Sequence, residues 1–239
     1  MAEKLVYDGL QSCPYLEGQV ARMPLYRQLR RLGLAATDAR FARAERRVGV
    51  CLYHTACPTC RACEGIRIPV ATFRPTKSQR RTKRKGDEAF RVEYGRATFT
   101  DEKLALFNKH KAQRGLIATD DEMVTPLGYA SWLVHSCVHT MEMRYYLHDQ
   151  LAAVGVVDLG LRGASSVYFY FDPDPEVARL SPGVYSVLRE LDLCRQTGRE
   201  HLYLGLYVRD CRHLSYKANY HPHERLVDGD WRLQDPETP

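Results

Sequence analysis

The sequence lacks any long apolar run, and no stretch approaches the roughly 20 residues that a membrane-spanning helix needs. Its first residues, MAEKLVYDG, also lack the charged and then apolar profile of a signal peptide. We therefore expect a cytoplasmic protein with no membrane partner. Internal repeats and low-complexity segments are absent too, so the chain is expected to form ordinary globular structure.

Acidic residues are missing from residues 74–85, RPTKSQRRTKRK, where seven of twelve residues are Lys or Arg. A merely solvated surface helix would normally intersperse Glu among its basic residues. A purely basic stripe instead suits phosphate contacts, because each neutralised phosphate releases counterions. The segment therefore predicts a nucleic-acid contact. Its predicted contact residues are Lys77, Arg80, Arg81, Lys83, Arg84 and Lys85.

Charge is divided unevenly along the 239 residues. Residues 1–95 contain 19 Lys and Arg against 9 Asp and Glu, whereas residues 96–239 contain 16 against 20. A basic first part suggests a polyanionic partner. We predict two domains with a boundary after residue 95, of which the first is basic and contains a cysteine cluster.

The cysteine cluster Cys57-Pro-Thr-Cys60-Arg-Ala-Cys63 has the two-residue spacing that lets thiolates converge on one metal ion. A fourth ligand would have to come from Cys13, Cys51 or His54. A zinc ion and an iron-sulfur cluster both suit such ligands, and reduced thiols in a small core are the alternative. The predicted metal ligands are Cys13, Cys57, Cys60 and Cys63.

Secondary-structure patterns in the second part are clear and predict an α+β fold with a mixed sheet. Thr100 is expected to cap a helix at Asp101–Arg114, and Ser181, Pro182 and Gly198 delimit a second helix. Strands are expected at residues 139–148, 151–160, 165–172 and 201–208, the first three as an antiparallel meander. In the first part we expect short strands, a helix at Tyr26–Leu32, and a helix at Thr76–Lys85 followed by a linker at Gly86–Glu88.

Several motifs together resemble the arginyl-tRNA-protein transferase family. In the first half these are CPYL from Cys13, the cysteine cluster leading into GIRI, and FRPTKSQRR at Phe73–Arg81. In the second half they are AVGVVDLG, VYFYFDP, SPGVYSVLRE and YLGLYVRDCRHLSYKANYHPHERL. The similarity runs over almost the whole chain in the family's order. Leu16 stands where eukaryotic members have a second cysteine.

The resemblance implies a C-terminal acyltransferase domain of the GNAT type. The short chain favours the bacterial branch, which moves leucine from leucyl-tRNA to proteins with N-terminal Asp or Glu and marks them for N-end rule degradation. Arginyl transfer to the same acceptors is the alternative within the family. We expect a monomer that needs no cofactor for its chemistry, because ester-to-amide transfer runs downhill.

An α-amine with a pKa of about 7.7–8 is partly neutral near pH 7, so the reaction needs positioning and oxyanion stabilisation more than a strong base. This predicts a site of tyrosines, backbone amides and a carboxylate. The predicted catalytic residues are Asp158, Tyr168, Tyr170, Asp172 and Tyr207. Cations must bind the acidic acceptor, and the predicted acceptor-binding residues are Arg80, Arg209 and Lys217.

Two other functions compete with aminoacyl transfer. An acetyl-CoA-dependent GNAT enzyme would share the fold, but the junction RLSPGV at Arg179–Val184 has Pro182 where a pyrophosphate-binding turn needs glycine. A zinc-stabilised RNA-binding module without catalysis would explain the cysteines and the basic segment. It would leave the larger second part without a role.

Overall fold

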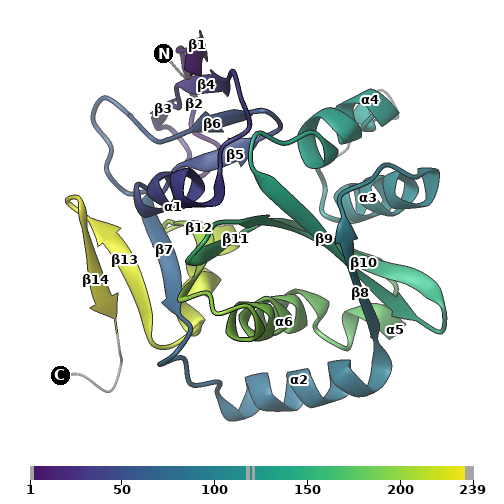
Figure 1. Ribbon diagram of the computed structural model, residues 1–239. Coiled ribbons are helices and arrows are strands. Elements are labelled where there is room, and N and C mark those ends of the chain that lie inside the picture. The colour runs from purple at the N-terminus through teal and green to yellow at the C-terminus, as the bar shows by residue number, and fades with distance from the viewer. Residues whose placement is uncertain (1–2, 117–118, 120–121, 235–239) are drawn as a thin grey trace.

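The computed structural model describes residues 3–116, 119 and 122–234, and an eight-stranded mixed sheet is its central element (Figure 1). The strand order is β14-β13-β7-β12-β11-β10-β9-β8. β11 and β12 are parallel, and the other neighbouring pairs are antiparallel. The strands are β7 (Glu64–Pro69), β8 (Arg91–Arg96), β9 (His139–Leu147), β10 (Gln150–Leu159), β11 (Gly163–Phe171), β12 (His201–Tyr207), β13 (His223–Val227) and β14 (Asp230–Gln234).

The predicted meander and crossover are confirmed. β9, β10 and β11 pair antiparallel in succession, and His148 and Asp149 turn the chain between the first two with positive φ. Helix α6 (Pro182–Gln196) follows, with Ser181 at its N-cap position and Gly198 just beyond its end. It crosses over the sheet to β12, as the α+β prediction requires.

A second, smaller sheet holds the N-terminal part (Figure 1). Its strands are β1 (Glu3–Tyr7), β4 (Leu25–Gln28), β6 (Cys51–Tyr53) and β5 (Arg46–Val48), next to the pair β2 (Leu10–Ser12) and β3 (Val20–Arg22) and helix α1 (Leu34–Ala42). The predicted helix at Tyr26–Leu32 is wrong. Leu25, Tyr26 and Arg27 pair with β6 instead, and α1 begins only after Gly33. Pairing with a distant strand overrides local helix propensity here.

The expected boundary after residue 95 runs through the eight-stranded sheet. β7 lies before this boundary, yet it pairs with β12 and β13, which lie after it. β8 spans the boundary and pairs with β9. The small sheet therefore accounts for only the first part of the predicted N-terminal domain. Independent folding of the two parts stays a prediction.

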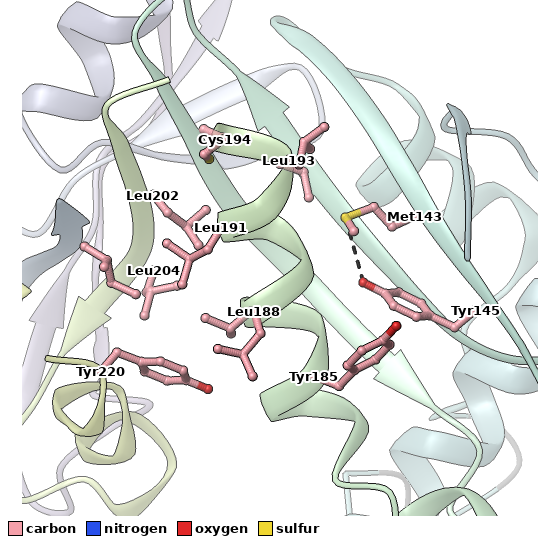
Figure 2. Close-up of a cluster of buried hydrophobic side chains, with 14 of the residues drawn as sticks. Met143, Tyr145, Tyr185, Leu188, Leu191, Leu193, Cys194, Leu202, Leu204 and Tyr220 are labelled. Atoms are coloured by element: carbon pink, nitrogen blue, oxygen red, sulfur yellow. Dashed lines mark hydrogen bonds between the residues drawn. The ribbon is translucent and has the colours of Figure 1, made fainter. Parts of the chain in front are cut away.

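The main core lies between the sheet and α6. Figure 2 shows Leu188 and Leu191 of α6 facing Leu202 and Leu204 of β12, with Tyr185 next to Tyr145. All of these side chains are buried. The apolar stripe of α6 is thus the face that packs on the sheet.

Helix α2 (Lys77–Ala89) packs on the outer side of α6 (Figure 1). Thr76 and Gln79 form a capping box at its start. The predicted linker at Gly86–Glu88 is wrong, because the helix continues through Gly86 to Ala89. Gly86 is the contact point with the ring of Tyr185, and a Cβ at this position would overlap that ring.

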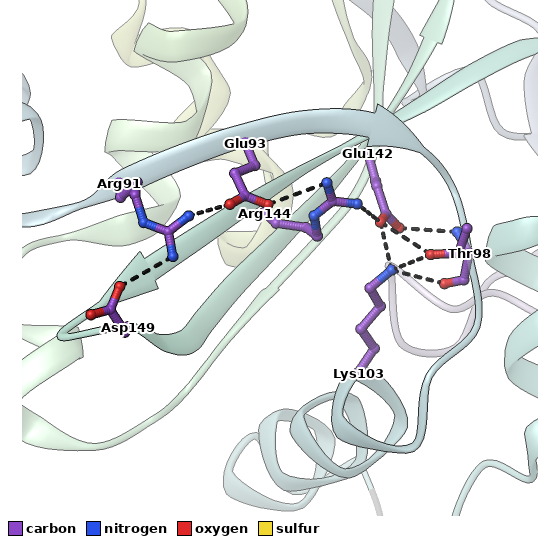
Figure 3. A network of polar contacts seen from close by, with 7 residues as sticks. All are labelled: Arg91, Glu93, Thr98, Lys103, Glu142, Arg144 and Asp149. Atoms are coloured by element: carbon purple, nitrogen blue, oxygen red, sulfur yellow. Dashed lines mark hydrogen bonds and ion pairs between the residues drawn. The ribbon is translucent and has the colours of Figure 1, made fainter.

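The opposite face of the sheet is covered by α3 (Asp101–Gln113), α4 (Pro126–Tyr129) and the π-helix η2 (Ala130–Val134). Thr100 caps α3 as predicted. Figure 3 shows that Lys103 of α3 is paired with Glu142 of β9, whose carboxylate also accepts from Arg144. Glu142 is 1% exposed, so the two cations compensate a buried charge, and Lys103 fixes α3 on the sheet. None of the described helices combines the length and the apolar character needed to cross a membrane.

The Gly86 contact generates a stability prediction. Replacing a helical glycine with alanine normally stabilises a helix by about 1 kcal/mol. At Gly86 we expect the free energy of unfolding to fall by about 1–3 kcal/mol instead, because Tyr185 must move. Gly183→Ala in α6 is the matched control, since nothing lies within 4 Å of a Cβ there. Urea unfolding measures both variants, and an equally stable Gly86→Ala would contradict the packing.

Candidate functional site

The large sheet has a gap between β11 and β12, its one parallel pair among the described strands. β11 and β12 are paired only along Gly163–Ser165 and His201–Tyr203. In open α/β sheets, ligands bind in the crevice outside the carboxyl ends of the strands. We therefore expect a functional site at the gap between the carboxyl ends of β11 and β12.

Arg46 of β5 fills the base of this gap. Its guanidinium donates to Ser165 Oγ and to the Ser166 carbonyl, both at 2.9 Å. On the other strand Gly205 has φ of +87° at a register shift, and a Cβ there would lie 2.7 Å from Arg46 Cζ. Glycine is required at this position by both the backbone conformation and the arginine.

A cavity of about 520 Å³ adjoins Arg46. It is bounded by β11, by the start of α6, by the end of α3 and by the segment that follows β12. That segment contains α7 (Arg212–Ser215) and the 3-10 helix η3 (Tyr216–Asn219), and α5 (Pro175–Ala178) precedes α6. Apolar lining residues are Val167, Phe169, Phe171, Ala178, Val184, Val187, Leu204 and Leu214. Charged or titratable lining residues are Arg46, His110, Arg114, Tyr168, Glu190, His213, Tyr216 and Lys217.

Glu190 contributes a buried carboxyl group to this cavity. Its side chain is 1% exposed, and Oε1 accepts from Ser186 Oγ at 3.2 Å and Ser166 Oγ at 3.3 Å. Oε2 has no hydrogen-bond partner among the described residues. Burial raises the pKa of Glu190 to about 7, against the lowering effect of the two serines and Arg46. A buried carboxylate oxygen without a partner is costly, which is typical of a site that a ligand completes.

Lys217 contributes an amine with an unusual pKa. Its Nζ donates to the Leu206 carbonyl at 2.7 Å. Burial, together with the charge of Arg46, lowers the pKa of Lys217 to about 7. Both the ammonium and the amine are therefore populated near neutral pH. With Arg46 and Arg114, Lys217 makes the cavity strongly cationic, and Glu190 is the only acid among the described lining residues.

Two of the residues predicted from the sequence line this cavity. Tyr168 comes from β11, and burial raises its pKa. Lys217 was predicted to bind the acceptor. Arg209 follows β12 on the surface, and Arg80 lies on α2, so neither of these two lines the cavity.

The other predicted catalytic residues have structural partners outside the cavity. Asp158 accepts from Arg47 Nε at 2.7 Å and from Thr140 at 2.5 Å, and the ion pair is almost fully buried. Tyr170 is fully buried, with its hydroxyl 2.6 Å from that of Tyr129.

Asp172 and Tyr207 are also engaged elsewhere. Asp172 is paired with Lys109 on the surface and accepts from the Asp174 amide. The ring of Tyr207 lies under the guanidinium of Arg225, 5.1 Å away. Catalytic roles for these two residues stay predictions.

Glu190 was missed in the sequence, although a signal was present. It is an acidic residue within the apolar stripe of α6, four positions after Ser186 and four before Cys194. Such a carboxyl group must be paired or functional. Arg46 had no comparable signal, because its partners lie 119 and 120 residues away.

The basic face of α2 forms a shallow hollow on the surface. Lys77, Arg80, Arg81, Arg84 and Lys85 are exposed, and the first four line the hollow together with Ser78. Lys83 differs, since it is paired with Asp87 of α2 and Asp192 of α6.

The predicted metal ligands line a different cavity, of about 670 Å³, in the N-terminal part. Cys13, Cys57, Cys60 and Cys63 share it with His54. Burial, followed by the neighbouring thiols, raises the pKa of Cys63 to about 12, which disfavours the thiolate that binds a metal. Among the described residues no group of three or more ligating side chains is arranged to hold an ion. The four cysteines fit a metal site by type and not by arrangement, so the site stays a prediction.

Two family models match the sequence. They are described as the N terminus and the C terminus of arginine-tRNA-protein transferase, and they match residues 11–81 and 102–227. An aspartate/glutamate leucyltransferase from Chromohalobacter salexigens is 34% identical over 227 residues, 94% of this chain and 90% of that protein. The enzymes of the same name from Stenotrophomonas maltophilia and Methylobacillus flagellatus are 34% and 33% identical and cover 95% and 92% of this chain, and 92% and 88% of their own.

A solved structure resembles the fold. It is a C-terminal DUF2156 domain from Agrobacterium fabrum, with a TM-score of 0.51 at 13% identity, and the match covers 73% of this chain and 59% of that one. At this identity the similarity concerns the fold alone.

We expect the stability of the protein to depend on the buried Arg47–Asp158 ion pair. Removing one partner leaves an unpaired buried charge, so Asp158→Asn should lower the free energy of unfolding by about 3–5 kcal/mol. Replacing Arg47 and Asp158 together with Met and Leu should restore part of this loss. Urea unfolding measures all variants. An Asp158→Asn protein as stable as the wild type would show that the pair does not hold β5 on β10.

Proposed function

This chain belongs to the arginine-tRNA-protein transferase family, and we propose that it moves leucine from leucyl-tRNA to the α-amine of proteins that begin with Asp or Glu. The names of its relatives support this donor and these acceptors. The single observation that best supports the proposed site is the cavity at Arg46, where three cations and one buried carboxyl group converge.

The proposed reaction is aminolysis of an ester. The acceptor nitrogen attacks the leucyl carbonyl carbon, the new C–N bond forms, and the bond to the ribose oxygen breaks. The amine loses a proton and the ribose hydroxyl gains one, so no cofactor and no ATP are required. Since an α-amine has a pKa of about 7.7–8, a fraction of it is already neutral at pH 7. Lys217, whose pKa is near 7, can carry the proton between the two groups.

The acceptor's acidic side chain suits the cationic lining. Arg46 and Arg114 present guanidinium groups to the cavity, and Lys217 adds an ammonium group. Guanidinium groups bind carboxylates through paired hydrogen bonds. We therefore extend the predicted acceptor-binding set by Arg46 and Arg114. Arg80 and Arg209 are assigned to other surfaces.

Tyr168 is the predicted catalytic residue that we retain at the site, as a hydroxyl donor toward the developing oxyanion. For Asp158 and Tyr170 we propose structural roles, since each is buried against a specific partner.

The tRNA is proposed to lie on the basic face of α2. This helix is packed on α6, which supplies Glu190 to the cavity. Gln79 of α2 also donates to the Asn219 carbonyl of η3 at 3.1 Å, next to Lys217. A tRNA bound along α2 is thus close in the fold to the elements that line the cavity.

The remaining features follow from the family. We propose a GNAT-like architecture for the second part, supported by the crossover helix and the separating parallel strands. We further propose that the protein acts as a cytoplasmic monomer and marks its acceptors for N-end rule degradation. Arginyl transfer is the alternative that the first experiment below distinguishes.

The first experiment measures transfer of radiolabelled leucine and arginine from charged tRNA to peptides that begin with Asp, Glu, Arg or Ala. We expect leucine to be incorporated only on the Asp and Glu peptides. Arginine on these peptides would change the donor and keep the family. A folded protein that transfers neither amino acid would leave the RNA-binding module as the better explanation.

The second experiment concerns α2. Replacing Arg80 and Arg81 with Ala should weaken tRNA binding and reduce the slope of log affinity against log salt by about 2, since each lost phosphate contact removes about 0.9. Arg162→Ala is the control, because Arg162 lies at the other end of the sheet and is paired with Glu200. Filter binding at several salt concentrations measures the slope. Equal slopes for the wild type and the double variant would exclude these two contacts.

A further inference from the structure

The buried carboxyl group of the cavity has one oxygen fixed and one oxygen unpartnered. Two serine hydroxyls hold Oε1 of Glu190, which orients the group, while Oε2 has no partner among the described residues. The side chain is 1% exposed and lines the cavity. A ligand with a positively charged donor group would complete this arrangement.

We propose that Glu190 binds the α-ammonium group of the amino acid carried by the tRNA, and that the adjoining apolar wall holds its side chain. This inference rests on the proposed function. Glu190, the one acidic group among the described lining residues, then binds the donor, and the cations of the cavity remain for the acceptor.

The two substrates differ in the charges they bring. The acceptor brings an amine that must be neutral to react, together with an acidic side chain. The donor brings an α-ammonium group that takes no part in the reaction and can stay charged throughout. A carboxylate that held the acceptor amine would stabilise its unreactive ammonium form. Glu190 therefore suits the donor and not the nucleophile.

The surroundings of Glu190 suit leucine as the donor amino acid. Val187 lies one helical turn before Glu190 on α6, and Phe169 and Leu204 line the same cavity from β11 and β12. An arginine side chain would require a second carboxylate next to the one that binds its α-ammonium. Among the described lining residues there is none.

The electrostatic environment of Glu190 agrees with this assignment. Its pKa of about 7 means that the group is only partly ionised without a ligand. An ammonium group at hydrogen-bond distance would lower that pKa and hold the carboxylate ionised. Arg46, the nearest cation that acts on Glu190, already donates to Ser165 and Ser166.

The test compares two donors that differ in one group. Leucyl-tRNA is compared with tRNA esterified to 2-hydroxy-4-methylpentanoate, in which a hydroxyl replaces the α-ammonium without added bulk. Transfer to a peptide that begins with Asp gives kcat/KM for each donor. The wild type should prefer leucyl-tRNA by between about tenfold and a hundredfold, the range for a hydrogen bond to a charged group.

Glu190→Gln should remove this preference. Its kcat/KM for leucyl-tRNA should fall by about the same factor, and that for the hydroxy donor should stay within about twofold of the wild type. Glu200→Gln is the matched control, since Glu200 is exposed and bonded to Arg162, and it should behave as the wild type. Thermal unfolding shows whether each variant is folded.

Each outcome bears on the proposal. A wild type that uses both donors equally would overturn it, whatever the variants do. Equal losses for both donors in a folded Glu190→Gln would overturn it as well, because the residue would then act in a step common to both. A wild type that transfers neither leucine from leucyl-tRNA nor the hydroxy acid from the second donor would reject the proposed function itself.

Discussion

Two neighbouring arginines on β5 hold the small N-terminal sheet on the large one and shape the cavity between β11 and β12. Adjacent residues of a strand point to opposite faces, so Arg46 and Arg47 reach different partners. Arg47 is buried against Asp158, and Arg46 fills the gap at which the parallel strands separate. A buried ion pair contributes little net stability, but it fixes position strongly, since either charge alone is costly. The cavity wall thus depends on a strand that precedes it by more than 100 residues.

Arg46 also sets the balance of charge in the cavity. Burial moves the pKa of Glu190 and that of Lys217 toward 7 from opposite directions. The guanidinium favours the charged form of Glu190 and disfavours that of Lys217. In the proposed mechanism, this one cation favours the ionised carboxylate that binds the donor ammonium group and the neutral amine that accepts a proton.

Sequence patterns could predict elements whose signals are local and could not predict contacts between distant segments. The Thr100 cap of α3, the Ser181, Pro182 and Gly198 that delimit α6, and the strand patterns of β9–β11 are local, and these elements are where they were expected. Ser181 stands at the start of α6 but its side chain makes no capping hydrogen bond. Tyr26 lies in a strand because it pairs with β6, and Gly86 lies within α2, where it packs on the ring of Tyr185. Of the residues predicted for the site, Tyr168 and Lys217 line the cavity. Arg46 could not be predicted, because only the fold brings it to its partners on β11.

Aminolysis of an ester needs its two reactants held together more than it needs a strong base, and this requirement explains the connection between α2 and the cavity. Well-oriented reactants can gain about 7–11 kcal/mol from proximity alone. A tRNA bound along α2 gains this only if α2 cannot move relative to the cavity. Three of its contacts show the restraint: Gly86 on Tyr185, Lys83 with Asp192 at 3.0 Å, and Gln79 with the Asn219 carbonyl. Two of them join α2 to α6, the helix that carries Glu190, and the third joins it to the segment that carries Lys217. With the tRNA on α2 as proposed, the rigid packing of this helix would hold the donor ester in place at the cavity.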